Sequence, residues 1–195
     1  MRSKIIPFLL LAATLVSIGC NVREKSSNGS ENVKIETPFG GMKVDTDESA
    51  IASDIGLPLY PGATRMHKDK DNGAADVNMN FGDFHLRVKA LSYHTTDSPE
   101  KVIAFYRKGL SSFGDVIECR DNHSVGNLSK TRQGLTCDDD KEDHMTVKGA
   151  PEHADLELKA GSKTHQHIVA VEKQSDGTRF GLVLLDLPND HKDSN

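Results

Sequence analysis

The sequence contains no tryptophan, and aromatic residues make up only 5% of its 195 residues. A core with so few rings is expected to be built mainly from aliphatic side chains. The chain also lacks a cluster of Lys and Arg interleaved with aromatic residues, and its 29 acidic against 24 basic residues give a formal charge of −5. Nucleic acids and anionic membrane surfaces bind basic patches. We therefore expect no nucleic acid as a partner.

The familiar catalytic motifs are missing as well. The sequence has no G-x-S-x-G nucleophile turn, no Cys–His set, no H-E-x-x-H zinc motif and no phosphate-binding loop ending in Lys-Ser or Lys-Thr. Each of these would place a reactive or ligand-binding side chain at a defined turn. Without them, the sequence predicts a protein that is not an enzyme and that carries no cofactor.

One apolar run is present, at the N-terminus. It extends from Ile5 to Ile18 and follows the basic residues Arg2 and Lys4. Fourteen residues of helix span about 21 Å, whereas a bilayer core requires about 20 apolar residues. A short apolar run behind positive charge is typical of a secretory signal.

The residues that follow this run, Ser17-Ile18-Gly19-Cys20, resemble the lipobox of bacterial lipoproteins. The resemblance implies that the Cys20 thiol receives diacylglycerol, that the signal is removed before it, and that the new N-terminus is acylated. Asn21 differs from the Asp that accompanies inner-membrane retention in this family. We therefore expect a lipid-anchored protein of the cell envelope, held at the outer membrane and facing the periplasm.

Composition divides the chain into four parts. Residues 1–19 form the predicted signal peptide, and residues 20–32 the lipidated cysteine with a polar, flexible tether. Residues 33–188 are long enough for one domain with its own core, and residues 189–195 form a polar tail. Loss of the signal leaves 22 of the 24 basic residues against 29 acidic ones, so the formal charge changes from −5 to −7.

Two cysteines remain in the body, Cys119 and Cys137. An even pair in an oxidising compartment is most simply a disulfide. The alternatives are a metal site or a redox pair, but the sequence has no C-x-x-C, and no His stands at ligand spacing beside either cysteine. We predict a disulfide between them.

Alternation of apolar and polar residues predicts several strands joined as hairpins. The hairpins are expected in residues 33–46, in 75–95 around Gly82-Asp83, and in 167–187 around Ser175-Asp176-Gly177. Two further strands, Val116–Arg120 and Gln133–Asp138, would carry the two cysteines.

Helical spacing is clearest after Ser98-Pro99, where Val102, Tyr106 and Leu110 recur on one stripe. A shorter helix over Glu48–Ile55 would end at Gly56. These elements together predict an α+β fold, in which an antiparallel sheet built of hairpins carries one main amphipathic helix.

Two segments resemble a pattern found in uncharacterised exported bacterial proteins and lipoproteins. They are Tyr60-Pro61-Gly62-Ala63 and the stretch from Thr96 to Arg107, TDSPEKV followed by FYR. In those proteins a loop of the first type precedes a hairpin, and the second segment opens a helix. The resemblance covers about residues 56–120 and implies a fold, but it implies no catalytic residues.

Two histidines stand out among nine. His165 and His167 flank one residue and would lie on the same face of a strand. Imidazole pairs of this kind can bind Zn²⁺ or Cu²⁺, although exposed histidines on a strand fit the pattern too. The sequence therefore predicts a membrane-anchored, non-enzymatic binding or structural module that meets a protein partner in the envelope. The alternative is a periplasmic metal-binding protein using these histidines.

Overall fold

The computed structural model describes residues 21–27, 30–45, 47–68, 71–72, 74–137 and 154–188. The predicted signal peptide, Cys20 and the polar tail 189–195 lie outside the described residues, so these expectations remain predictions.

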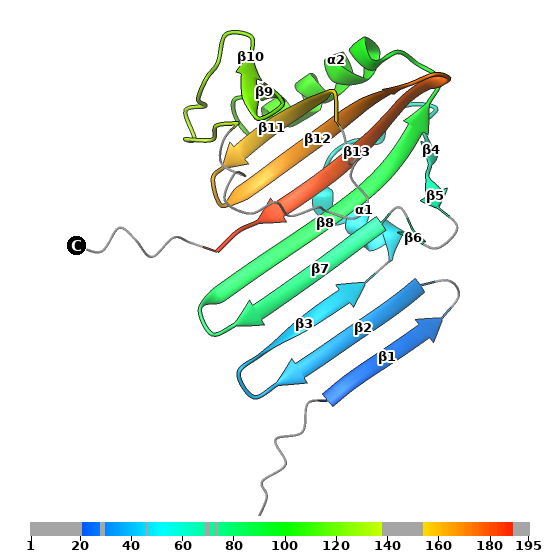
Figure 1. Cartoon of the computed structure of the whole chain (residues 1–195), viewed down its shortest axis with the longest axis vertical. Helices are drawn as coiled ribbons and strands as arrows, with labels where there is room; N and C mark the ends of the chain where they lie inside the picture. The colour runs from blue at the N-terminus through cyan, green and yellow to red at the C-terminus, as the bar shows by residue number, and fades with distance from the viewer. Residues whose placement is uncertain are drawn as a thin grey trace, which may run out of the picture.

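An antiparallel sheet of eleven strands dominates the fold, in the order β1-β2-β3-β7-β8-β13-β12-β11-β9-β10, with β4 paired to β8 (Figure 1). A separate two-stranded sheet pairs β5 (His67–Lys68) with β6 (Asp71–Asn72). The strands of the main sheet are β1 (Asn21–Ser27), β2 (Ser30–Thr37), β3 (Gly40–Asp45), β4 (Thr64–Arg65), β7 (Ala74–Phe81), β8 (Phe84–Thr95), β9 (Ile117–Arg120), β10 (His123–Val125), β11 (Leu156–Ser162), β12 (His165–Gln174) and β13 (Gly177–Asp186).

The three predicted hairpins are present as β2–β3, β7–β8 and β12–β13. Successive side chains of a strand point to opposite faces of the sheet, so a period of two in the sequence indicates a strand. In the β7–β8 turn Gly82 has a φ of +57°, which a side chain would strain. The prediction of a sheet-dominated α+β fold with antiparallel hairpins agrees with this structure.

Two helices lie on the same face of the sheet: α1 (Glu48–Ile55), which matches the predicted shorter helix, and α2 (Pro99–Leu110), followed by the 3-10 turn η1 (Ser111–Phe113). Asp47 caps α1 by accepting hydrogen bonds from two backbone N–H groups, and Gly56 ends it with a φ of +68°. Neither helix in the described ranges is long and apolar enough to cross a bilayer.

The core between helices and sheet is mainly aliphatic, as expected, but it also contains a cluster of rings. Tyr60, Tyr93 and Tyr106, all the tyrosines of the chain, are buried there with Phe180. The ring of Phe180 stacks on Tyr93 at 5.6 Å and lies 5.4 Å from Tyr106. A small number of aromatic residues can therefore still form a ring cluster, because all three tyrosines and Phe180 are buried together here.

A second apolar cluster lies on the opposite face of the sheet. Its buried members come from β7, β8, β12 and β13, namely Ala75, Leu86, Val88, Ala90, Ile168, Val183 and Leu185. On β8 the two faces alternate, so Leu86, Val88 and Ala90 belong to this cluster, whereas Leu91 and Tyr93 belong to the core under the helices. The central strands are thus apolar on both faces.

The N-terminal part of the body differs from the expected flexible tether. Residues 21–27 and 30–37 form β1 and β2, which pair in register over seven residue pairs. The sequence of β1, NVREKSS, has no apolar alternation, so pattern alone could not reveal the strand. Backbone hydrogen bonds to β2 order it instead, and these need no particular side chain. The sheet therefore begins directly after Cys20 in the chain.

A second difference concerns the strand expected over Gln133–Asp138. Residues 131–137 are irregular, and a turn closes where the Gly134 N–H donates to the Thr131 carbonyl at 3.0 Å. The Leu135 N–H is satisfied by the Thr131 hydroxyl at 3.0 Å. Side-chain bonds of this kind compete with strand pairing, which explains why the segment is not a strand.

Candidate functional site

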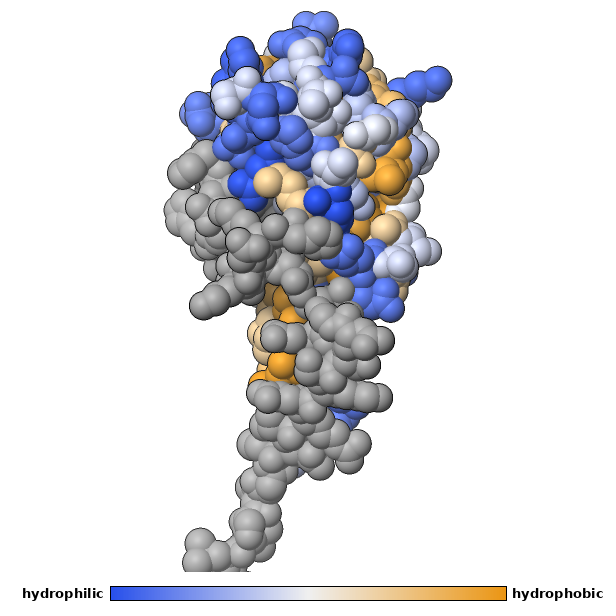
Figure 2. Space-filling model, turned by 90° about the vertical axis from the view of Figure 1, so that its right-hand side faces the viewer, coloured by the Kyte–Doolittle hydropathy of each residue, from blue (hydrophilic) through white to orange (hydrophobic). Residues whose placement is uncertain are grey.

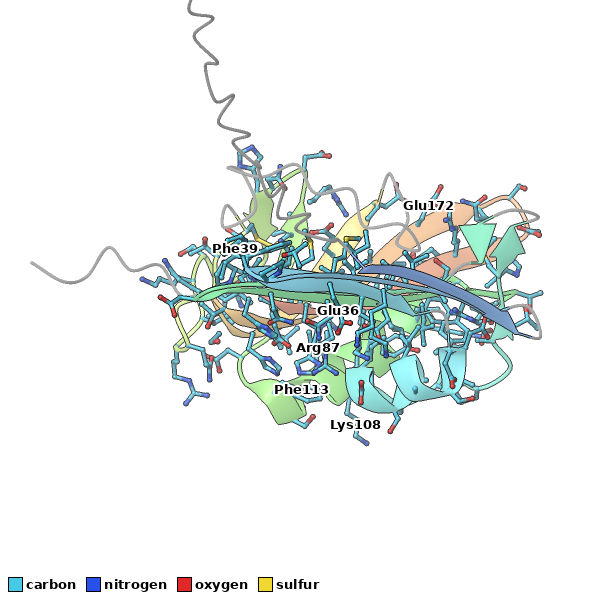
Figure 3. All side chains as sticks on the ribbon, turned by 90° about the horizontal axis from the view of Figure 1, so that it is seen from below. Glu36, Phe39, Arg87, Lys108, Phe113 and Glu172 are labelled. Carbon is cyan, nitrogen blue, oxygen red and sulfur yellow. A yellow bond between two sulfur atoms is a disulfide. The ribbon has the colours of Figure 1, made fainter. Side chains whose placement is uncertain are left out.

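Four charged side chains meet where α1 lies over β7 and β8; we call Asp54, Asp76, Arg87 and Lys89 the ionic cluster. The Lys89 ammonium lies 2.5 Å from Asp54 and 2.6 Å from Asp76, and Arg87 reaches Asp54 at 2.7 Å. Lys89 is almost fully buried, with its side chain 4% exposed. Figure 3 places Arg87 on the helix side of the sheet.

The electrostatics of this cluster favour its ionised form. The hydrogen bond from Lys89 lowers the pKa of the Asp54 carboxyl, and attraction to Lys89 and Arg87 adds to the effect against the opposing influence of burial. A buried ammonium is stable only when it is paired. The ionic cluster therefore holds α1 against the sheet, with each cation committed to a carboxylate.

The two predicted histidines lie beside this cluster. In the sheet register Arg87 pairs with Asp186, and Asp186 pairs with His165 on β12. Similarly, Lys89 pairs with Leu184, which pairs with His167. The prediction that His165 and His167 share one face of a strand is confirmed, and their rings lie 5.1 Å apart, edge to face.

The environments of the two imidazoles differ. His167 is buried, stacks on the ring of Phe113 at 3.6 Å, and donates from Nδ1 to the Ile55 carbonyl at 3.1 Å. A carbonyl can only accept, so Nδ1 carries the proton. Burial, and then the neighbouring His165, lower the pKa of His167, which favours the neutral form of this ring. His165 is exposed, and its Nδ1 contacts Asp186.

For metal binding, the arrangement is incomplete within the described part of the chain. No group of three or more His, Cys, Asp or Glu side chains there is placed to hold a metal ion. Both Nδ1 atoms are nevertheless fixed, one by a carboxylate and one by a backbone carbonyl. Such outer partners are the ones that orient metal-binding histidines through their other nitrogen.

The predicted disulfide is present between Cys119 on β9 and Cys137, which are 18 residues apart with 5.6 Å between their Cα atoms. Both cysteines are buried, and with Ile117 and Leu135 they form a small apolar cluster of their own. The irregular segment 131–137 is therefore attached to the sheet by this cluster and not by strand pairing.

The same loop is closed a second time, by an ion pair. Arg132 bonds both carboxylate oxygens of Asp115, with the shortest contact at 2.7 Å. These bonds lower the pKa of Asp115 to about 2. The segment after β9 is thus tied twice to the chain before it, by Arg132 to Asp115 and by Cys137 to Cys119.

A groove of about 660 Å³ opens between the first turn of α2 and the adjoining ends of β9, β11 and β12. Its walls include the apolar side chains of Ile103 and Leu156 and the charged side chains of Glu100, Arg120 and Lys173. Charges of both signs around a small apolar floor suit a polar ligand or a peptide segment. No sequence motif marks this groove, because its residues come from four separate segments of the chain.

Comparisons with known proteins found no relative: no family model, no curated protein and no solved structure matches the chain.

Proposed function

We propose that the protein is a lipid-anchored, non-enzymatic binding module of the bacterial cell envelope, attached through Cys20 to the outer membrane and facing the periplasm. The observation that carries this proposal is the disulfide between Cys119 and Cys137. Disulfides form and persist in exported proteins and are rare in the cytosol. The signal-like leader and the lipobox-like residues before Asn21 supply the route of export and the anchor.

A binding role is favoured over catalysis by the way the reactive groups are engaged. Lys89 is shared by two carboxylates, and His167 is neutral, buried and bonded to a backbone carbonyl. A general base or nucleophile needs its reactive atom within reach of a substrate. The groove beside α2 is the binding site of this proposal, and its partner is a polar ligand or an envelope protein.

The anchor has a direct test. In native cells a Cys20→Ala variant should lose its lipid label, retain its leader and be lost from the outer-membrane fraction, because acylation and cleavage both require the thiol. Metabolic labelling with a fatty acid and membrane fractionation measure the result. The Cys119→Ala/Cys137→Ala variant, which keeps Cys20, is the control and should remain membrane-bound. A Cys20→Ala protein that still carried the label would contradict the proposal.

Metal binding is the second candidate function, favoured by the fixed Nδ1 atoms of His165 and His167. With Nδ1 protonated, Nε2 is the atom left with a lone pair on each neutral ring. A Zn²⁺ ion held there would complete its four ligands with water or with groups of a partner.

Calorimetric titration of Zn²⁺ into the protein decides this candidate. We expect a binding heat that is lost in His165→Ala, a variant chosen because this ring is exposed and its removal leaves the core intact. His94→Ala is the matched control, since His94 also contacts a carboxylate, that of Asp176 at 3.3 Å. A wild-type protein that gives no heat, or equal losses in both variants, would eliminate the candidate.

A further inference from the structure

Three phenylalanines are exposed at one end of the sheet. Phe39 lies in the β2–β3 turn with its side chain 78% exposed, and Phe81 and Phe84 flank the β7–β8 turn at 43% and 42%. The two turns are neighbours, because Gly40 pairs with Phe81 across β3 and β7. We call Phe39, Phe81 and Phe84 the aromatic tips.

The start of β1 lies at the same end. A single register row runs across five strands, from Asn21 through Glu36, Gly41 and Asn80 to His85. Phe84 is one residue from this row, and Phe39 lies in the turn just beyond it. Four strand spacings separate β1 from β8, about 19 Å. The residue that follows Cys20 therefore shares one narrow end of the sheet with all three aromatic tips (Figure 1).

The opposite end of the sheet is more hydrophilic. There β8 ends at Thr95, 11 residues and about 36 Å from Phe84. Seen from that end, the upper body is mostly hydrophilic apart from an apolar band along one flank (Figure 2). Exposed phenylalanine is costly in water, and a concentration of it beside a lipid attachment point calls for an apolar environment.

We propose that the aromatic tips insert into the surface of the lipid bilayer, so that the body stands on the membrane on this end of its sheet. Side chains of this type bury themselves at the boundary between headgroups and acyl chains. The inference rests on the proposed function, because lipidation of Cys20 brings this end to the bilayer. The aromatic tips then fix the orientation of the body, which a lipid anchor alone leaves free.

Charge does not drive this contact. The chain is acidic overall, so an anionic lipid surface repels the body rather than attracts it. Insertion through apolar side chains is therefore insensitive to salt, unlike the contact of a basic patch.

Phe39 points to the side of the sheet away from the helices (Figure 3), the side on which the second apolar cluster lies.

Because the chain contains no tryptophan, the fluorescence of one introduced tryptophan reports on a single position. A Phe39→Trp variant, lipidated on Cys20, carries a single indole at the tip of the β2–β3 turn. It is reconstituted into vesicles of phosphatidylcholine, which carries no net charge, with bromine on the acyl chains. We expect its fluorescence to shift to the blue and to be quenched by the bromine, to the same degree at low and high salt.

A Leu59→Trp variant is the matched control, because Leu59 is also exposed, at 55%, but lies in the loop near the far end of β8. Its fluorescence should not be quenched. Adding Phe84→Glu to Phe39→Trp places a charge between the tips and should remove the quenching. Phe84 is partly exposed, and the thermal midpoint of this variant is measured to show that the fold is kept.

The outcomes separate the two proposals. A protein whose mass shows no lipid on Cys20 overturns the proposed function. A lipidated Phe39→Trp variant without quenching overturns the docking and leaves the anchor standing. A blue shift without bromine quenching means that another protein surface, such as a second copy of the chain, covers the tips, and it overturns the docking as well.

Discussion

Replacing Tyr106 by alanine should lower the free energy of unfolding by about 3–5 kcal/mol, the largest effect expected from a single substitution here. The Tyr106 ring is fully buried at the centre of α2, with Phe105 at 5.0 Å and Phe180 at 5.4 Å between centroids. Alanine would leave a cavity in the place where helix, loop and sheet meet. Denaturant unfolding monitored by circular dichroism measures the change.

The hydroxyl of Tyr106 contributes separately. It accepts a hydrogen bond from the buried Tyr60 N–H at 3.2 Å, which ties the loop before β4 to α2. Tyr106→Phe keeps the ring but leaves that N–H without its acceptor, so we expect a loss of about 1–3 kcal/mol. Lys108→Ala, on the exposed side of the same helix, is the control and should change stability by less than about 0.5 kcal/mol. Equal losses in Tyr106→Phe and Lys108→Ala would contradict the assignment.

Removing the disulfide should cost on the order of 3 kcal/mol, because a crosslink closing a loop of about 18 residues restricts the unfolded chain by that amount. The double variant Cys119→Ala/Cys137→Ala, measured in a Cys20→Ala background, isolates this bond from the proposed lipid. Its unfolding midpoint in denaturant should fall relative to the parent.

Reduction gives an independent measurement of the same quantity. A thiol reductant should lower the midpoint of the Cys20→Ala parent to that of the triple variant and should leave the triple variant unchanged. A parent whose midpoint does not respond would show that the bond contributes nothing, and the Asp115–Arg132 pair would then be the contact that closes the loop.

The parts of the fold that were predictable are those with short-range signals. The β7–β8 hairpin was visible because Val77 and Met79 alternate with polar residues and Gly82 supplies the turn. Helix α2 was visible because Val102, Tyr106 and Leu110 recur at helical spacing, and these three are its buried residues. In both cases the residues that pack together are close in sequence.

Other features depended on partners far along the chain. Strand β1 is ordered by backbone pairing, which leaves no trace in side-chain pattern. The segment around Gln133 has enough apolar residues for a strand, but the Thr131 turn and the disulfide hold it otherwise. The cluster of rings within the core could not be foreseen either, since Tyr60 and Tyr106 are 46 residues apart.

The candidate site also has features that the sequence predicted and features that it did not. The shared face of His165 and His167 follows from the period of two in a strand and was predicted correctly. The burial of His167 under Phe113 was not, because η1 and β12 are distant in sequence. The ionic cluster was missed for a related reason: a lysine such as Lys89, alternating with apolar residues, resembles a solvent-facing position until a helix is placed over it.

The register of β1 has a mechanical consequence. Its seven residue pairs with β2 lie side by side along the strand, and the chain enters at the end of the strand. A pull applied at Asn21 along the strand axis therefore loads all seven pairs at once in shear, whereas a pull across the sheet would unzip them one after another. An attachment before Asn21 that pulled along the strand axis would therefore be resisted by all seven pairs together.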